Sequence, residues 1–519
     1  MTSASIAAGK PNPWLIAVVV SVATFMEVLD TTIANVALPY IAGGMAVSSD
    51  EATWVVTTYL VANAVILTAS SHLAKALGRK RFFLICLALF TTSSILCGLS
   101  WDIRSLLFFR ILQGLGGGGM VPVSQSILAD AFPPEKRGQG FSLFGIAVVV
   151  APVIGPTLGG WLSDNFSWHW CFLINGPIGL MSIALVTAVV QETETPRDLP
   201  RFDLLGFLLV STFLGSLEVV LDRGEIEDWF ASGFILTFSA IGGLAFTLMI
   251  PWEVSHKNPV VDIRMIATRQ FGSCFFVMLA IGAILIATTQ MLPQMLQLSF
   301  GYTAMLAGLV LSPGGLVTMA MMLVVGRLSG RVQPKYLIMT GAAIVAASMY
   351  NLTSLYADLD FWFFARSRIY IGVGLPLIFI PITTASYEGV PPGKTDQASA
   401  MINVARNVGG SIGVSIAQNV LAHREQFHMS RLVETTIPST IQYQEALKRA
   451  QDYFLSAGSS ASQAQRQAMQ WIGRQIATQS SLLAYIDVFA TLMVLALLVI
   501  PLSLILRRSR AGAKAAVAH

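Results

Sequence analysis

The sequence predicts an all-α polytopic membrane protein with fourteen transmembrane helices. Of its 519 residues, 54% are hydrophobic and only 12% are charged, whereas a soluble domain carries roughly 25% charged residues. Apolar runs of about 20 residues, the length that a helix needs to cross a bilayer, recur along the whole chain. The runs lack the alternation of short barrel strands, so we expect helices. A soluble globular protein is excluded.

Polar, glycine or proline breaks separate fourteen apolar runs. The runs begin near residues 14, 52, 82, 105, 138, 170, 203, 231, 271, 302, 336, 361, 398 and 486. The first, Trp14 to Leu38, is too long for the core of a signal peptide and precedes many others, so it is expected to remain as the first helix. All four cysteines fall inside apolar runs without metal-type spacing, which is typical of small buried residues.

The basic residues orient the predicted helices. With the N-terminus inside, the inner loops carry most lysines and arginines, including Arg79 to Arg81 and Lys136–Arg137, whereas the short outer loops hold only Arg104 and Arg223. The positive-inside rule therefore predicts that both termini are cytoplasmic. The net charge of +4 reflects this topology, and nucleic acid is not expected as a partner.

The first half of the sequence recurs in the second. Arg110 to Gly116 matches Arg368 to Gly374, and Gly155 matches Gly413 at the same offset. Parallel repeats of this kind predict two six-helix bundles. The predicted units are an N-terminal bundle at 14–191, two inserted linker helices at 203–250 and a C-terminal bundle at 271–506.

One outer segment, 423–485, is long, polar and rich in Gln, Ala and Ser. Its stretches 443–455 and 465–476 are amphipathic, so we expect a periplasmic helical loop within the C-terminal bundle, packed on itself or on a partner. The alternative is a partly disordered loop without a binding role.

Two acids and one arginine are candidates for proton coupling. Glu27 and Asp30 lie three residues apart on one face of the first helix. An acid in an apolar span is costly unless it is paired, hydrated or protonated, so it usually has a function. Arg110 in the fourth run is expected at a depth similar to that of Asp30, where a change in their separation would couple protonation to conformation. The alternatives are a carboxylate that only hydrogen-bonds a neighbouring helix and a permanent ion pair.

Two further patterns indicate moving parts. The fifth run contains small residues at helical spacing and two prolines, which allow close packing and a bend: Pro152, Gly155, Pro156, Gly159 and Gly160. Gly78 and Arg79, between the second and third runs, are candidates for a conformational gate that pairs with acids or helix C-termini. The alternatives are an ordinary kinked helix and a topology signal.

Polar residues within the runs are candidates for the lining of a substrate cavity. They are Asn35, Asn63, Gln113, Gln125, Asn175, Gln290, Gln294, Asn403, Arg406 and Asn407. Each of them alone is explained as well by a hydrogen bond between helices.

The combined motifs resemble the major facilitator superfamily, specifically its fourteen-helix drug:proton antiporter branch. Leu29 to Pro39 is similar to the branch's first-helix signature, Arg110 to Gly116 to the fourth-helix motif, and Gly155 to Gly160 to the antiporter motif. The sequence departs from the superfamily at Ser71 and Lys75, where a glycine and an aspartate are usual.

The resemblance implies a proton-coupled multidrug efflux transporter that exports hydrophobic, often weakly acidic compounds by alternating access. It implies a Gram-negative inner-membrane protein that works with a periplasmic membrane-fusion adaptor and a TolC-like outer-membrane channel. The proton gradient would drive it without a cofactor. The 423–485 segment is the candidate docking site for the adaptor.

Other functions fit the sequence less well. A dedicated exporter of a fatty acid, siderophore or other metabolite shares every feature above, and only a substrate panel separates the two. The intramembrane acids and the antiporter motif argue against a receptor or scaffold. No metal-type spacing or nucleophile constellation indicates an enzyme, and the lack of a G-x-x-x-x-G-K-[ST] sequence disfavours ATP-driven transport.

Overall fold

The computed structural model describes residues 12–192, 202–356, 359–391 and 393–507, and all regular elements in these ranges are helical. The first half contains α1 (Pro13–Met45), α2 (Ser49–Leu77), α3 (Arg79–Gly98), α4 (Ile103–Gly117), α5 (Met120–Ala131), the 3-10 turn η1 (Pro134–Lys136), α6 (Arg137–Asn165), α7 (Trp170–Leu173) and α8 (Asn175–Val189). Next come α9 (Leu204–Arg223), η2 (Trp229–Ala231), α10 (Gly233–Ser255) and α11 (Ile263–Ile266). The second half contains α12 (Arg269–Ser299), α13 (Ala304–Leu328), α14 (Pro334–Leu352), α15 (Phe361–Ser386), α16 (Thr395–Thr435), α17 (Ile441–Ser456) and α18 (Ala461–Leu504).

Local sequence sets where several helices begin and break. Ser48 and Glu51 start α2 with reciprocal side chain to backbone hydrogen bonds. The chain turns from α2 into α3 at Gly78, whose φ of 84° favours glycine. The glycine run between α4 and α5 packs tightly, because a Cβ on Gly116 or Gly118 would lie 2.5 or 2.3 Å from the backbone of α3 or α2.

Twelve helical segments of the described chain are long and apolar enough to cross a membrane. They include α4 with α5 and α7 with α8 as single segments, but neither α14 nor α16. These two helices nevertheless pack against other long helices of the chain. The α14 helix contacts α15 and α18, and α16 contacts α12 and α18. Most helices begin within a few residues of the expected positions.

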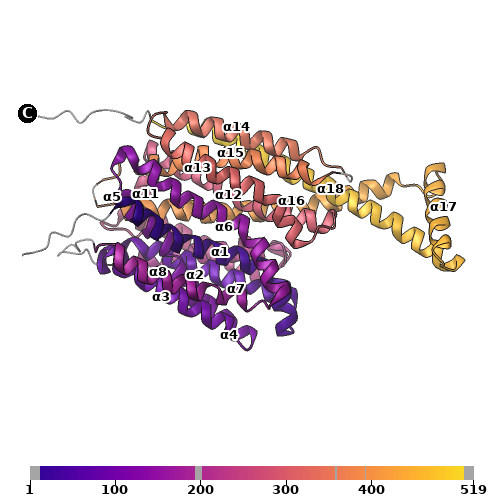
Figure 1. Cartoon of the computed structure of the whole chain (residues 1–519), viewed down its shortest axis with the longest axis horizontal. Helices are drawn as coiled ribbons and strands as arrows, with labels where there is room; N and C mark the ends of the chain where they lie inside the picture. The colour runs from indigo at the N-terminus through magenta and orange to yellow at the C-terminus, as the bar shows by residue number, and fades with distance from the viewer. Residues whose placement is uncertain (1–11, 193–201, 357–358, 392, 508–519) are drawn as a thin grey trace, which may run out of the picture.

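The last helix differs from the expectation. It was expected near residue 486, but α18 begins at Ala461 and has 44 residues. The amphipathic stretch 465–476 and the apolar run after it form one rod, because no glycine or proline between residues 474 and 500 stops the helix. We call residues 423–485 the stalk: the end of α16, α17 and the start of α18. It projects beyond the other helices in Figure 1.

The contacts follow the sequence repeat. Within the halves, α1 packs on α6 and α12 packs on α16. Between the halves, α2 contacts α16 and α6 contacts α13. Each of these contacts joins the second long helix of one half to the fifth of the other, as a two-fold relation between repeats requires. The inserted helix α9 lies against both α2 and α16.

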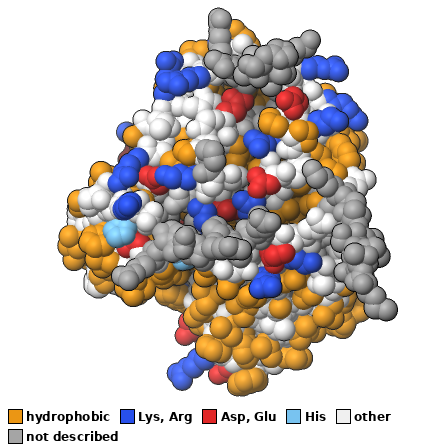
Figure 2. All heavy atoms as spheres, turned by 90° about the vertical axis from the view of Figure 1, so that its left-hand side faces the viewer, with side chains coloured by type: hydrophobic (Ala, Val, Ile, Leu, Met, Phe, Trp, Pro, Cys, Tyr) orange, Lys and Arg blue, Asp and Glu red, His pale blue; other side chains and the backbone are white. Residues whose placement is uncertain are grey.

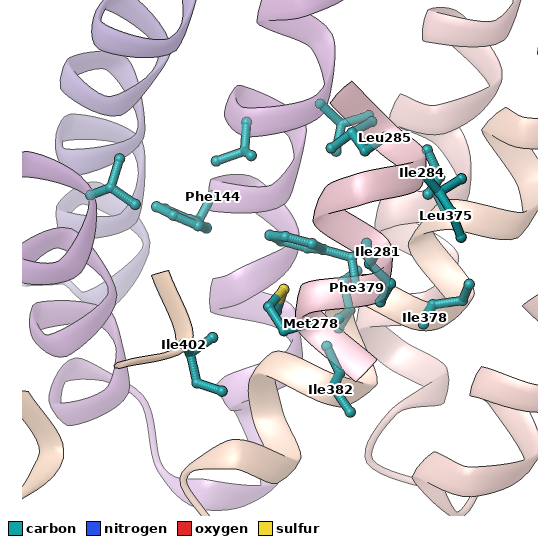
Figure 3. Close-up of a cluster of buried hydrophobic side chains, with 14 of the residues drawn as sticks. Phe144, Met278, Ile281, Ile284, Leu285, Leu375, Ile378, Phe379, Ile382 and Ile402 are labelled. Carbon is teal, nitrogen blue, oxygen red and sulfur yellow. The ribbon is translucent and has the colours of Figure 1, made fainter. Parts of the chain in front are cut away.

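An apolar cluster fills the space between the halves. Phe144 of α6, Met278 of α12 and Phe379 of α15 are buried in it (Figure 3). Nearby, Phe141 of α6 stacks on Tyr387 with ring centroids 5.5 Å apart. These rings lie toward the end of the molecule at which α3, α6, α12 and α16 begin, which we call the basic end. Figure 2 shows the many Lys and Arg side chains on this face.

Candidate functional site

Asp30 on α1 is the centre of a buried hydrogen-bond network. Its side chain is 1% exposed. Arg110 Nη1 donates to Oδ2 at 2.7 Å, Gln113 Nε2 to Oδ1 at 2.9 Å, and Asn175 Nδ2 to Oδ1 at 2.7 Å. Because these donors come from α4 and α8, one carboxylate ties α1 to both helices.

Arg110 is equally enclosed. Its Nε donates to the carbonyl oxygen of Val55 at 2.9 Å, and its guanidinium lies 4.2 Å from the centre of the Tyr59 ring. Its Nη2 has no hydrogen-bond partner among the described residues. A buried guanidinium is costly without a counter-charge, so Arg110 and Asp30 depend on each other in this conformation.

Asn175 was predicted only as one of several candidates for the cavity lining, and its place beside Asp30 was not predicted. Besides Asp30, it donates to Ser94 Oγ at 3.0 Å on α3. The sequence showed only that an amide side chain lies in an apolar run. Several other amides lie in apolar runs as well, so this pattern did not single out Asn175. Gln113, expected to line a cavity, instead orients Asp30.

Glu27 lies one helical turn from Asp30 and has a separate set of partners. It is 6% exposed and accepts hydrogen bonds from Tyr59 Oη at 3.1 Å and Asn63 Nδ2 at 3.2 Å. Both donors lie on α2. The two acids therefore share α1 but link it to different neighbours.

A small polar pocket separates Glu27 from the second half of the chain. Its far wall is α16, where Asn407 Nδ2 donates to Asn63 Oδ1 at 3.4 Å. The Arg406 guanidinium contacts Asn407 Oδ1 at 3.3 and 3.4 Å, while its Nη1 has no partner within the described chain. The lining residues are Glu27, Asn63, Leu67, Gly117, Gly118, Val121, Pro122, Asn403, Arg406 and Asn407. A carboxylate of one half thus shares a pocket with a guanidinium of the other.

The remaining polar candidates divide into two groups. Gln125 on α5 joins the halves, because its Oε1 accepts hydrogen bonds from Asn403 Nδ2 at 2.7 Å and Ser399 Oγ at 3.1 Å. The structure does not bring Asn35, Gln290 or Gln294 to this pocket. Asn35 and Gln290 are exposed on α1 and α12, and Gln294 pairs with Gln418 at 3.3 Å.

The glycine and proline motif of α6 lies between two helices. On one side, a Cβ on Gly155 would lie 2.1 Å from Thr32 Oγ1, and one on Gly159 would lie 3.2 Å from the Ile33 carbonyl oxygen of α1. On the other side, a Cβ on Gly308 of α13 would lie 2.1 Å from Thr157 Oγ1 of α6. Pro152, Pro156 and Gly160 belong to the same stretch of α6. The α6 helix thereby packs closely against both α1 and α13 of the other half.

Arg79 joins the two halves of the chain at the basic end. Its Nε and Nη2 donate to the two carboxylate oxygens of Asp396 on α16, at 2.8 and 3.2 Å. Its Nη1 also binds Asp130 on α5. Asp396 is 6% exposed. The residue after Gly78 therefore joins α3 to the second half, and this partner had not been predicted.

Comparison with known proteins identifies the family of this chain. The family model of the Major Facilitator Superfamily matches residues 20–414. The chain is 34% identical over 481 residues to the multidrug export protein EmrB of Escherichia coli (strain K12), covering 92% of this chain and 91% of EmrB. It is also 34% identical over 481 residues to the fatty acid resistance protein FarB of Neisseria gonorrhoeae, and the match covers 92% of this chain and 93% of FarB.

Solved structures show the same fold at low sequence identity. The human organic anion transporter MFSD10 (TETRAN) matches with a TM-score of 0.57 and 12% identity, covering 94% of this chain and 100% of that chain. A bacterial homologue of the human lysosomal transporter Spinster, in an inward-facing and unoccupied conformation, matches with a TM-score of 0.55 and 16% identity. The match covers 97% of this chain and 100% of that chain. The resemblance seen in the first-helix, fourth-helix and antiporter motifs is confirmed: the chain belongs to the major facilitator superfamily, a family of transporters rather than enzymes, and is similar within it to the EmrB multidrug export proteins.

Proposed function

We propose that this protein is a drug:proton antiporter that exports hydrophobic, often weakly acidic compounds by alternating access. The observation that carries the proposal is the Asp30 network: a carboxylate in the middle of a membrane helix, held by three donors from two other helices. Intramembrane acids of this kind serve proton relays. Transporters of this family need no cofactor, and the proton gradient would supply about 2.3 kcal/mol per charge per 100 mV, plus its pH component.

The proton would act through helix contacts. Protonation of Asp30 from the outer side removes the charge that holds Arg110, so α1 is freed from α4. Because α6 packs on α1 at Gly155 and on α13 at Thr157, this shift changes the contact between the halves. Loss of the proton to the inside restores the ion pair and resets the transporter. Glu27 would assist, because its charge lies in the pocket that Arg406 enters from the other half.

The substrate would enter the pocket between the halves when it widens. Asn63, Asn403, Asn407 and Arg406 offer polar contacts there, and Arg406 suits an acidic group on the substrate. Relatives point in two directions, since one is named a multidrug export protein and another a fatty acid resistance protein. Export of a fatty acid or a similar metabolite is therefore the second candidate, and a receptor or scaffold role has no such support.

We place all fourteen long helical segments in the membrane, by adding α14 and α16 to the twelve apolar ones. The units would be a six-helix bundle at 14–191, inserted helices at 203–250 and a second bundle at 271–506. The basic end would face the cytoplasm of a Gram-negative cell and the stalk its periplasm. The terminal residues 1–11 and 508–519 lie outside the described ranges.

The stalk would dock a membrane-fusion adaptor that leads to a TolC-like channel. It exposes large apolar side chains on two of its helices, including Ile441 at 73%, Tyr453 at 68% and Trp471 at 43%. Replacing residues 436–459 by a short Gly-Ser linker should abolish adaptor pull-down in detergent while leaving the membrane helices folded. Unchanged pull-down would remove the stalk from the proposal.

Drug-driven proton movement in proteoliposomes tests the antiport proposal. Asp30→Asn keeps the shape of the side chain but cannot be protonated, so drug efflux should uncouple from proton uptake. Asp164→Asn is the matched control, because Asp164 is exposed and binds only Tyr40 among the described residues. Full coupling in Asp30→Asn would overturn the proton assignment, and no coupling in the wild-type protein would overturn antiport. A parallel panel of drugs and fatty acids separates the two substrate classes.

A further inference from the structure

An open groove lies between α16 and α18 at the base of the stalk, apart from the pocket between the halves. It holds about 460 Å³. Its lining residues are Asn419, Val420, His423, Arg424, Asp487, Ala490, Thr491 and Val494. The residues toward the stalk are charged or polar, and those toward the basic end are mostly apolar, so the groove is amphipathic along its length.

The polar part contains both signs of charge. Arg424 Nε donates to Asp487 Oδ2 at 2.5 Å, and His428 Nε2 lies 2.8 Å from the same oxygen. The other carboxylate oxygen of Asp487 accepts no hydrogen bond from the described residues, and Asp487 is 29% exposed. Arg424 is 40% exposed, so its guanidinium can also reach a ligand.

The groove lies at the outer boundary of the bilayer. At 1.5 Å per residue, Arg424 is about 42 Å along α16 from Asp396 at the basic end, and a bilayer with its headgroups is about 40–45 Å thick. On α18, Asp487 is about 30 Å from Arg507, which matches the hydrocarbon thickness. The charged part is therefore at headgroup level and the apolar part at acyl-chain level.

The apolar part faces lipid. Val494 in the groove is 53% exposed, and Leu498, one turn further along α18, is also 53% exposed. On α16, Ile416 is 43% exposed. These apolar side chains form an outer wall suited to hydrocarbon.

We propose that this groove binds an outer-leaflet phospholipid whose headgroup carries both a phosphate and an ammonium group. The phosphate lies against Arg424, the ammonium against the free oxygen of Asp487, and one acyl chain runs along Val420, Ala490 and Val494. A purely anionic headgroup fits less well, because it would face the Asp487 carboxylate without a compensating cation. The proposal needs only the membrane placement of α16 and α18, not antiport.

Native mass spectrometry of the purified full-length protein tests the site. The delipidated protein is titrated with phosphatidylethanolamine, with phosphatidylglycerol and with water-soluble phosphoethanolamine. We expect the wild-type protein to prefer phosphatidylethanolamine over phosphatidylglycerol by about fivefold or more, the effect of roughly one favourable charge contact. Phosphoethanolamine alone should not compete, because it lacks the acyl chains.

The variants separate the two charges. Arg424→Gln should weaken binding of both lipids, whereas Asp487→Asn should abolish the preference between them. Arg449→Gln is the matched control, since the Arg449 side chain pairs only with Glu445 on the exposed stalk helix α17 among the described residues. Val494→Trp should block the acyl chain without touching the ion pair, which keeps the test valid if a charge variant fails to fold.

Three results would overturn the proposal: equal binding of the two lipids by the wild-type protein, unchanged binding in both Arg424→Gln and Val494→Trp, or competition by phosphoethanolamine as strong as that by the lipid. Displacement of the lipid by a transported drug that binds more tightly would make the groove a drug site and would also overturn it.

Discussion

Arg79 on α3 forms a bidentate ion pair with Asp396 on α16, in which Arg79 Nε and Nη2 donate to the two carboxylate oxygens at 2.8 and 3.2 Å. Arg79 is 12% exposed and Asp396 is 7% exposed at their side chains, so water screens the pair weakly. Toward the same end of the molecule, Phe141 of α6 stacks on Tyr387, so an aromatic contact joins the two halves beside the ion pair.

Asp396→Asn should open the basic end. The amide carries no charge to pair with the Arg79 guanidinium. Because Arg79 keeps Asp130 as a second, more exposed partner, the loss should be smaller than the about 3–5 kcal/mol of a buried charge left without any partner. A cysteine introduced at Ser399, which is buried behind the pair, should then react faster with a maleimide added from the basic side. All four native cysteines are buried, so background labelling should be low.

Asp130→Asn is the control for this prediction. Asp130 also binds Arg79, but it belongs to the same half and is 49% exposed. Its removal should change labelling at position 399 little. Equal effects of the two variants would mean that Asp396 does not hold the halves together.

Arg110→Lys should lower the stability of the protein, because lysine cannot take over both contacts of Arg110. An ammonium group cannot reach the Val55 carbonyl and Asp30 together in the geometry of the guanidinium. Arg110→Met should be more harmful, because it leaves Asp30 buried without its counter-charge, at about 3–5 kcal/mol. Thermal unfolding in detergent measures both effects. The double variant Arg110→Met/Asp30→Asn should recover much of the lost stability but no proton coupling.

Gly155→Ala should destabilise the protein by about 1–3 kcal/mol, as overpacking does, because the new Cβ meets Thr32 Oγ1 at 2.1 Å. The obstacle is the Thr32 side chain, whose Oγ1 and Cβ lie 2.1 and 2.7 Å from the new Cβ. Thr32→Gly in the same protein leaves only a backbone carbon at 3.4 Å, so it should restore transport and much of the stability, less the cost of a helical glycine. Gly473→Ala on α18 has open space around it and should be neutral. Failure of the rescue would show that Gly155 is needed for a backbone movement rather than for space.

Glu218→Leu should loosen the inserted helix α9. Glu218 is 3% exposed and accepts a hydrogen bond from Ser411 Oγ of α16 at 2.6 Å, while Asp222 on the same helix binds Thr57 of α2. We expect faster hydrogen exchange in α9 in Glu218→Leu, and near wild-type exchange in Glu218→Gln, whose carbonyl can still accept the bond. Identical exchange in the two variants would show that the hydrogen bond between Glu218 and Ser411 does not hold α9 in place.

The sequence predicted two kinds of relationship in the site: residues that share a face of one helix, and residues that lie at the same depth along different helices. Glu27 and Asp30 share a face because their spacing is three, and Arg110 reaches Asp30 because both are at similar depth in neighbouring helices. The bond from Asn175 to Asp30 was missed because an amide in an apolar run has the same pattern whether it binds a carboxylate or another helix. Asp396 was missed because it is 317 residues from Arg79, and no local pattern reports such a contact.

The repeat predicted backbone positions better than side-chain roles. Gly413 packs against Ala283 of α12, as Gly155 packs against Thr32 of α1. Arg368, by contrast, occupies the repeat position of Arg110 but has two guanidinium nitrogens without partners among the described residues. Packing glycines are fixed by the two-fold relation of the halves, whereas an ion pair also needs an acid on the facing helix, and α12 offers none.

The length of α16 has a mechanical consequence. It is one unbroken helix of 41 residues that holds Asp396 at one end, Arg406 about three turns further along and part of the stalk at the other end. A rod of about 60 Å that tilts by about 10° around its centre moves each end by about 5 Å in opposite directions. If α16 tilts as a rigid rod when the contact between Arg79 and Asp396 breaks, we expect the stalk to swing, and a protein bound to the stalk would then respond to the transport cycle.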